Sequence, residues 1–203
     1  MLPPISKHVQ AAYVSSPLRY SNRYREFQEN VKKSGILGSF NFKRWTWPAP
    51  GEVFLPKCPI FYRPHYWYST LAHKAILNDA WVNKYECVFI AEDDLMPVPN
   101  CDALIQAAWE NLPDDWYALQ LGSLLNCVEE IPGKPIKLAT GGEAIVGYFW
   151  SRPGIEAMLQ RCYEMPHTVI DWITADLQKQ SRKIYAPLQW AVVQQGKQYG
   201  EAD

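Results

Sequence analysis

The 203-residue sequence predicts an α/β fold, with a mixed, mainly parallel sheet that helices cover on both faces. Two observations lead to this prediction. Segments with the three- and four-residue spacing of amphipathic helices alternate with short apolar runs along the chain. The runs are apolar throughout, which is typical of strands buried on both faces. A chain of this length suits one hydrophobic core, so we expect residues 1–203 to form a single domain.

The first third of the chain predicts a strand, a helix and an irregular region. An apolar run over residues 8–15 ends at a Ser-Ser-Pro sequence, as a buried strand does before a loop. A helix is expected over residues 20–34, because apolar residues recur at helical spacing as far as Val31, and Gly35 closes it. Residues 40–66 are rich in proline and turn residues, so we expect an irregular region with one short strand.

The rest of the chain continues the alternation of helices and strands. Good helix formers predict a helix over residues 69–82. The apolar run over residues 87–91 predicts a buried strand whose C-terminal end leads into the acidic triplet Glu92-Asp93-Asp94. The remaining predicted elements are helices over residues 101–112, 153–163 and 169–180 and strands over residues 116–121 and 144–150.

Charge and cysteine usage exclude some classes of partner. The chain has 20 basic and 21 acidic residues and a net charge of -1, so it lacks the Lys and Arg excess of a nucleic-acid or anionic-membrane binder. No apolar run approaches the roughly 18 residues of a membrane span. The 5 cysteines are widely spaced, without a Cys-x-x-Cys pair. We therefore expect a cytoplasmic protein with reduced thiols and no membrane span.

Aromatic residues are abundant, with 9 Trp, 12 Tyr and 7 Phe. Core packing explains most of them, because aromatic side chains bury large apolar areas. Sugar rings also stack on aromatic faces, and a carbohydrate site would use some of these residues. Trp45 and Trp47, in the proline-rich stretch RWTWPAPG, are the ones that we expect at a site.

The triplet Glu92-Asp93-Asp94 is the main candidate for chemistry. Adjacent carboxylates repel one another and raise each other's pKa values, so a counter-charge is needed. Mg²⁺ or Mn²⁺ supplies one, since such ions bind one or two carboxylates together with phosphate oxygens. In extended backbone Glu92 and Asp94 would share a side while Asp93 faces the other way.

The triplet is also compatible with roles other than metal binding. A solvated acidic loop would contain such residues, and either Asp93 or Asp94 would serve as a helix N-cap. Even as a metal site at the end of a buried strand, the triplet does not distinguish a glycosyltransferase from a phosphatase, a nuclease or a nucleotidyltransferase.

The order of several motifs resembles the lipopolysaccharide-type glycosyltransferases of family 25. The matching segments are Ser69-x-x-x-His73, the strand over residues 87–94, the sequence LPDDWYALQLG over residues 112–122, residues 147–159, residues 166–171, and Ala186-Pro187 with Gln194-Gln195. The resemblance covers residues 69–196, with a weaker match before them. It implies a GT-A type fold, which is a Rossmann-like variant of the predicted architecture.

The resemblance also implies a site. Glu92 and Asp94 would hold Mn²⁺ or Mg²⁺ against the diphosphate of a nucleotide sugar, with UDP-hexose as the expected donor, and Asp93 would face the ribose or sugar. The family inverts the anomeric configuration, so a general base must take the proton of the acceptor hydroxyl. Asp171 matches the late Asp of the family and is the candidate base, although it would equally serve as the N-cap of the following helix.

Further residues are candidates for donor binding. They are Arg19, Arg23, Ser69, His73, Gln194 and Gln195. Arginine suits phosphate oxygens, but arginines after a strand are often only solvated. His73 has an alternative too, because a lone histidine on an apolar helix is commonly packed in the core.

Departures from the family keep different functions open. The family has a Gly-Cys pair ahead of Ser-His and an Asp-Arg-x-x-Arg motif after the first strand. In this chain the corresponding stretches, residues 65–69 and residues 17–23 respectively, have different sequences. A catalytically reduced domain that binds a sugar or a partner is one alternative to a transferase acting on a glycan hydroxyl. Another metal-dependent enzyme, such as a nucleotidyltransferase, is the second. A two-metal phosphoesterase would use more His and Asp ligands than the 4 scattered histidines suggest.

Overall fold

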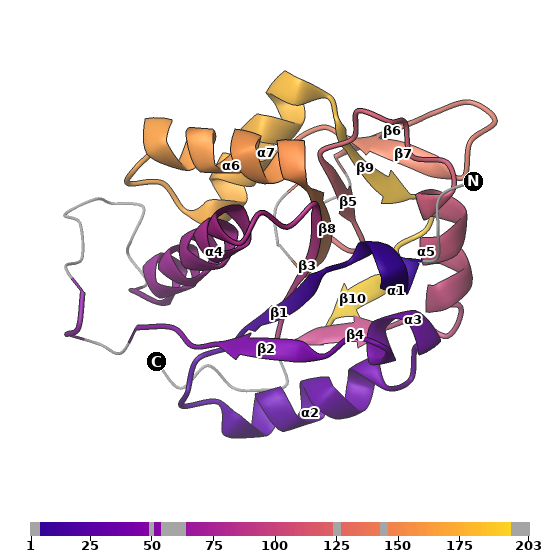
Figure 1. Ribbon diagram of the computed structural model, residues 1–203. Helices are drawn as coiled ribbons and strands as arrows, with labels where there is room; N and C mark the ends of the chain where they lie inside the picture. Colours follow the sequence, from indigo (N-terminus) through magenta and orange to yellow (C-terminus); the bar gives the residue numbers. More distant parts are fainter. Residues whose placement is uncertain (1–4, 49–50, 54–63, 124–126, 143–145, 196–203) are drawn as a thin grey trace.

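The computed structural model describes residues 5–48, 51–53, 64–123, 127–142 and 146–195 (Figure 1). Its centre is an eight-stranded sheet with the order β2-β1-β3-β8-β5-β9-β7-β6. The strands are β1 Ala11–Ser15, β2 Phe42–Trp45, β3 Cys87–Glu92, β5 Ala118–Gln120, β6 Val128–Glu130, β7 Ile136–Ala139, β8 Gly147–Ser151 and β9 Ile184–Pro187. All of them except β7 and β8 run in the same direction, so the sheet is mixed and mainly parallel.

Helices cover both faces of this sheet. They are α1 Ile5–His8, α2 Ser21–Val31, α3 Gly35–Gly38, α4 Pro64–Val82, α5 Cys101–Trp109, α6 Arg152–Glu164 and α7 Ile170–Ser181. Helices α4, α6 and α7 lie together on one side, and α2, α3 and α5 lie on the other side with α1 (Figure 1). The predicted α/β architecture is therefore confirmed.

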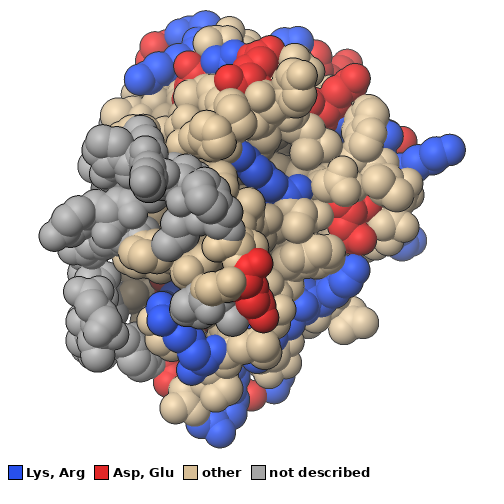
Figure 2. Space-filling view, turned by 90° about the vertical axis from the view of Figure 1, so that its left-hand side faces the viewer, with Lys and Arg blue, Asp and Glu red and all other residues tan. Residues whose placement is uncertain are grey.

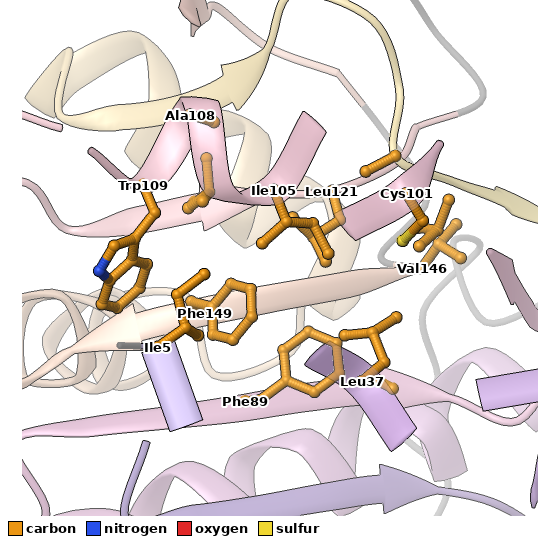
Figure 3. Close-up of a cluster of buried hydrophobic side chains, with 14 of the residues drawn as sticks. Ile5, Leu37, Phe89, Cys101, Ile105, Ala108, Trp109, Leu121, Val146 and Phe149 are labelled. Carbon is orange, nitrogen blue, oxygen red and sulfur yellow. The ribbon is translucent and has the colours of Figure 1, made fainter. Parts of the chain in front are cut away.

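Strand β3 divides the core into two clusters. Phe89 contributes to the cluster beneath α2, α3 and α5, where its ring lies 4.6 Å from that of Phe149, and Trp109 packs against Phe149 from α5 (Figure 3). Ile90 points to the opposite face and joins the cluster beneath α4, α6 and α7. Because both faces are covered, the strand is apolar from Cys87 to Ala91, as the sequence predicted, and only its last residue, Glu92, is charged.

A small second sheet lies beside the end of β3. Strand β4 (Leu95–Pro97) pairs antiparallel with β10 (Val192–Gln194), with Gln194 opposite Leu95. The start of β10 is fixed to the end of β5. The backbone N–H groups of Ala191 and Val192 both donate hydrogen bonds to the carbonyl oxygen of Leu121. This pairing brings the last described strand next to the acidic triplet.

Several sequence predictions need correction at the ends of elements. The helix expected over residues 20–34 is α2, which ends at Val31. Gly35 does not close it but begins α3, which Ser34 caps by accepting a hydrogen bond from the backbone N–H of Leu37. The strand expected from residue 8 begins at Ala11, after α1. Helix α4 begins at Pro64, where proline suits the first turn.

The remaining predictions are confirmed with small shifts at the boundaries. The helices expected over residues 101–112, 153–163 and 169–180 are α5, α6 and α7, and the short strand expected in residues 40–66 is β2. The strand expected over residues 144–150 is β8, and its first predicted residues lie outside the described part of the chain. Strands β4, β6, β7, β9 and β10 were not predicted.

The surface agrees with the near-neutral composition. On the face shown in Figure 2, Lys and Arg side chains are interspersed with Asp and Glu side chains over the described residues. Within the same described residues, no helix combines the length and the apolar character needed to cross a membrane.

Gly122 tests how tightly β10 is held. A Cβ atom at Gly122 would lie 2.4 Å from the carbonyl oxygen of Val192, so Gly122→Ala must push β10 away from β5. We expect a loss of about 1–3 kcal/mol in the free energy of unfolding, measured by urea denaturation. A loss below about 0.5 kcal/mol would show that β10 is free to move and is not fixed by this contact.

Candidate functional site

The candidate site lies where β1, β2 and β3 end at the same edge of the sheet. Parallel pairing places Ser15 opposite both Trp45 and Glu92, the last residues of the neighbouring strands. The residue after β1, Ser16, therefore lies beside Asp93. This edge is the usual place for ligands in open α/β sheets.

Asp93 is the buried anchor of the triplet, with a side chain that is 2% exposed. Its Oδ2 atom accepts a hydrogen bond of 2.8 Å from the hydroxyl of Ser16, and its Oδ1 atom lies 2.6 Å from Nη2 of Arg23. Burial raises the pKa of Asp93 to about 6, while Arg23 and Ser16 act in the opposite direction. Both carboxylate oxygens of Asp93 are thus engaged within the protein.

Asp94 is held on one oxygen only. Its Oδ2 atom accepts hydrogen bonds from Nη2 of Arg23 at 3.0 Å and from Nε2 of Gln194 at 2.8 Å. The backbone N–H of Gln195 donates to the carbonyl oxygen of Asp94 at 2.7 Å. The Oδ1 atom is buried and has no hydrogen-bond partner in the described structure. Asp94 therefore has one oxygen available for a ligand.

Glu92 faces α4 and not α2. Its Oε1 atom accepts a hydrogen bond from Ser69 at 3.4 Å and lies 3.4 Å from Nε2 of His73. Burial and the neighbouring charges of Asp94 and Asp93 raise the pKa of Glu92 well above its usual range. Burial also lowers the pKa of His73 to about 4, so this imidazole is neutral near pH 7.

The expected alternation of the three carboxylates is wrong beyond Glu92. Strand β3 ends at Glu92 and a turn follows, so Asp93 and Asp94 both reach the guanidinium of Arg23. Neither aspartate begins a helix, and Asp93 is buried, so the triplet is neither a helix cap nor a solvated loop.

Asp171 lies in α7, on the side of the sheet that α4 also covers. The N-cap of α7 is Val169, so Asp171 lies in the first turn and is not the cap. Burial is the main influence on His73 and Tyr148, lowering the pKa of the histidine and raising that of the tyrosine, and the negative charge of Asp171 acts upward on both pKa values. The charge of Glu92 also raises the pKa of Tyr148. The structure thus brings Asp171, His73 and Glu92 into one electrostatic neighbourhood.

Two further predicted residues lie at the margin of the site. Arg19 is exposed and its guanidinium lies over the ring of Tyr20, at 4.9 Å from the ring centroid. The side chain of Gln195 donates to Glu26 at 3.4 Å, so only its backbone contacts the triplet.

The two tryptophans singled out in the sequence differ in their surroundings. Trp47 donates a 2.7 Å hydrogen bond from Nε1 to the hydroxyl of Ser15, at the sheet edge that bears the site. Trp45 packs edge-on against Tyr13, with 6.2 Å between ring centroids, and so belongs to the core.

Ser16 and Arg44 are site residues that the sequence prediction missed. Arg44 donates from Nη2 to the hydroxyl of Ser16 at 3.1 Å and to the carbonyl oxygen of Pro17 at 2.8 Å. Its guanidinium stacks on the ring of Tyr24, 4.5 Å from the centroid. The Ser-Ser-Pro sequence after the first strand was a signal for Ser16, whereas the position of Arg44 depends on the pairing of β1 with β2.

Unsatisfied polar atoms gather in this site. Four of the seven buried side-chain polar atoms that lack a hydrogen-bond partner in the described residues belong to it, namely Arg23 Nε, Arg44 Nε, His73 Nε2 and Asp94 Oδ1. Buried polar atoms in folded proteins nearly always have a partner, and an absent ion, water or ligand is a common reason for an exception. The site therefore offers both donors and an acceptor to a polar ligand.

The fit of a divalent cation depends on two carboxylates. No three His, Cys, Asp or Glu side chains among the described residues come together as a metal-binding group. A cation held by Glu92 and Asp94 would therefore have to be one such as Mg²⁺ or Mn²⁺, which take one or two protein carboxylates and complete their shell with water and phosphate. The unpartnered Oδ1 atom of Asp94 is the observation that favours this fit.

Comparison with known proteins gives a structural likeness but no sequence match. No protein-family model matches the sequence, and no curated protein matches it. Among solved structures, the chain is similar to a glycosyltransferase involved in the glycosylation of the major capsid of PBCV-1, with a TM-score of 0.47 and 12% sequence identity over 84% of this chain and 75% of that chain.

Ser16 tests the anchoring of Asp93. The change Ser16→Ala removes the hydrogen bond to Oδ2 of a buried carboxylate, so we expect the free energy of unfolding to fall by about 1–3 kcal/mol. Ser39→Ala, at an exposed serine, is the matched control and should change it by less than about 0.5 kcal/mol. Equal effects of the two substitutions in urea denaturation would contradict this role of Ser16.

Proposed function

We propose that the protein is a glycosyltransferase that moves a sugar from a nucleotide diphosphate sugar, UDP-hexose in the first instance, to a hydroxyl group of a glycan acceptor. The reaction would be assisted by Mn²⁺ or Mg²⁺ and would invert the anomeric configuration. The observation that supports this proposal best is the carboxylate triplet at the sheet edge, surrounded by buried polar atoms without partners. The motif order that resembles glycosyltransferase family 25, with its GT-A fold, gives the reaction class.

The mixture of charges at the site favours a phosphorylated donor over a neutral sugar. Arg23 and Arg44 each have an Nε–H group without a partner, and guanidinium groups bind phosphate oxygens well. Carboxylates alone would repel a diphosphate. A divalent cation on Glu92 and Asp94 would remove that repulsion and stabilise the negative charge of the departing diphosphate.

The neighbours of the carboxylates would orient them for this task. Ser69 and His73 contact Glu92 from α4, and Gln194 holds Oδ2 of Asp94 from β10, which leaves Oδ1 of Asp94 without a partner in the described structure. Asp93 has both oxygens engaged, so its contribution to the ribose or sugar would be made through Arg23 and Ser16. Arg19 and the backbone of Gln195 remain candidates at the margin of the donor site.

Asp171 is the proposed general base. It belongs to α7, on the side of the sheet from which His73 contacts Glu92, whereas Arg23 contacts the two aspartates from α2. An acceptor that enters from the side of Asp171 would thus meet the sugar on the face opposite the diphosphate. The carboxylate of Asp171 would accept the hydroxyl proton as the new glycosidic bond forms.

The second candidate is a catalytically reduced domain that binds a sugar or a partner. Arg23 already contacts both Asp93 and Asp94, and a site neutralised in this way can be stable without a cation. Such a domain would bind nucleotides weakly or not at all, and its binding would be indifferent to metal. A nucleotidyltransferase that uses the same carboxylates is a less favoured third candidate.

Asp94 tests the donor site directly. We expect UDP and UDP-hexoses to raise the melting temperature only when Mn²⁺ or Mg²⁺ is present, and Asp94→Ala to abolish that response, because it removes the unpartnered oxygen. Thermal-shift and calorimetric titrations with a panel of nucleoside diphosphates and nucleotide sugars measure this.

Asp115→Ala is the matched control for this experiment. It removes an exposed aspartate that precedes β5 at the opposite edge of the sheet, and it should bind the nucleotide as the wild type does. Binding to no member of the panel, or binding that is indifferent to both metal and Asp94, would contradict the proposed function.

Asp171 tests the catalytic proposal separately from binding. We expect Asp171→Asn to lower transfer to the acceptor by about 10²–10⁴-fold while the donor dissociation constant stays within about twofold, because only proton removal is lost. Asp176→Asn, later in the same helix, where the partly exposed aspartate pairs with Arg161 of α6, is the control. A loss of donor affinity equal to the loss of turnover would assign Asp171 to binding or folding.

A further inference from the structure

Arg23 already supplies a counter-charge inside the carboxylate triplet. A single nitrogen, Nη2, lies 2.6 Å from Oδ1 of Asp93 and 3.0 Å from Oδ2 of Asp94. The neighbouring histidine, His73, lies against Glu92, with 3.4 Å between Nε2 and Oε1, and not against the two aspartates. Arg44 reaches the triplet only through the hydroxyl of Ser16. Among the described side chains, the guanidinium of Arg23 is thus the one cation in direct contact with the two aspartates.

We propose that Arg23 is the internal counter-cation of the donor-free protein and competes with the divalent cation for Asp94. This inference rests on the proposed function, because it takes the cation to bind at Glu92 and Asp94. It goes beyond a general phosphate-binding role, because it gives Arg23 one set of contacts before the donor binds and another afterwards.

The two contacts of Arg23 differ in how easily they are given up. Asp93 is 2% exposed and contacts no second cation among the described side chains, so the shorter contact to it must persist. Asp94 is 13% exposed, and its Oδ2 atom also accepts a hydrogen bond from Gln194. The longer contact between Arg23 and Asp94 is therefore the one that a divalent cation would replace.

Release from Asp94 would leave Arg23 suited to a diphosphate. Its Nε–H group has no partner in the described structure, and its side chain is 25% exposed, so it can reach a ligand while Nη2 remains on Asp93. Binding of the cation would thus free an N–H group of Arg23 to donate a hydrogen bond to phosphate. Binding of the phosphate would in turn favour the position of Arg23 in which Asp94 is open to the cation. The two ligands are expected to bind cooperatively.

The test is a titration of the protein with Mn²⁺ alone. Electron paramagnetic resonance of the free ion and calorimetry each measure the affinity for Mn²⁺. The main variant is Arg23→Met combined with Asp93→Asn, which removes the guanidinium without leaving a buried unpaired charge and keeps the net charge unchanged. We expect this double variant to bind Mn²⁺ about tenfold more tightly than the wild type, because a competing positive charge has gone.

Three further variants make the result specific. Asp93→Asn alone keeps Arg23 on Asp94 and should bind Mn²⁺ no more tightly than the wild type. Arg25→Met removes an exposed arginine two residues further along α2 and should change the Mn²⁺ affinity by less than about twofold. Arg23→Lys keeps a cation for Asp93, but its side chain ends one bond short of Nη2 and would hold Asp94 less closely, so an increase of about threefold is expected even if the double variant does not fold.

The outcomes separate this inference from the proposed function. If the wild type binds UDP with Mn²⁺ but neither Arg23 variant gains Mn²⁺ affinity, the competition is refuted and the donor site stands. If the Arg23 variants gain Mn²⁺ affinity but no nucleotide binds, the competition stands and the proposed function is refuted. Absence of Mn²⁺ binding in every variant overturns the competition outright.

Discussion

The ion pair between Asp93 and Arg23 is the interaction on which the site depends. A carboxylate that is 2% exposed needs a charged partner and full hydrogen bonding, since an unpaired buried charge costs several kcal/mol. Arg23 comes from α2, and Ser16, the second partner, comes from the end of β1. The requirement of one buried carboxylate therefore fixes α2, β1 and β3 relative to one another, and it places Arg23 within reach of Asp94.

The sheet edge separates two chemical environments around the carboxylates. On the α2 and β10 side, Arg23, Arg44 and Gln194 present nitrogen donors to Asp93 and Asp94 or to Ser16 beside them. On the α4 and α7 side, Glu92 and Asp171 both lie near His73, and burial raises the pKa of Glu92. The proposed inverting transfer would use this division, because the departing phosphate and the attacking hydroxyl lie on opposite faces of the sugar.

Sequence reasoning was most successful where one segment determines the structure by itself. The apolar run over residues 87–91 is apolar because both faces of β3 are covered, and that pattern located the triplet at a strand end. It failed where distant segments decide. Arg44 enters the site only because β2 pairs with β1, and β4 and β10 are three-residue strands without a periodicity of their own. The turn after Glu92, which brings Asp93 and Asp94 to one guanidinium, was equally invisible in the sequence.

The central claim is that the triplet is a cation-assisted nucleotide diphosphate site. Crystals of the protein grown with UDP and Mn²⁺ test it most directly, through the anomalous scattering of manganese. We expect one manganese peak bonded to Asp94 Oδ1 and Glu92, the diphosphate bound to the same ion, and Arg23 contacting Asp93 and phosphate but no longer Asp94. UDP bound at the sheet edge without manganese, or a manganese–UDP complex away from Glu92 and Asp94, would contradict it.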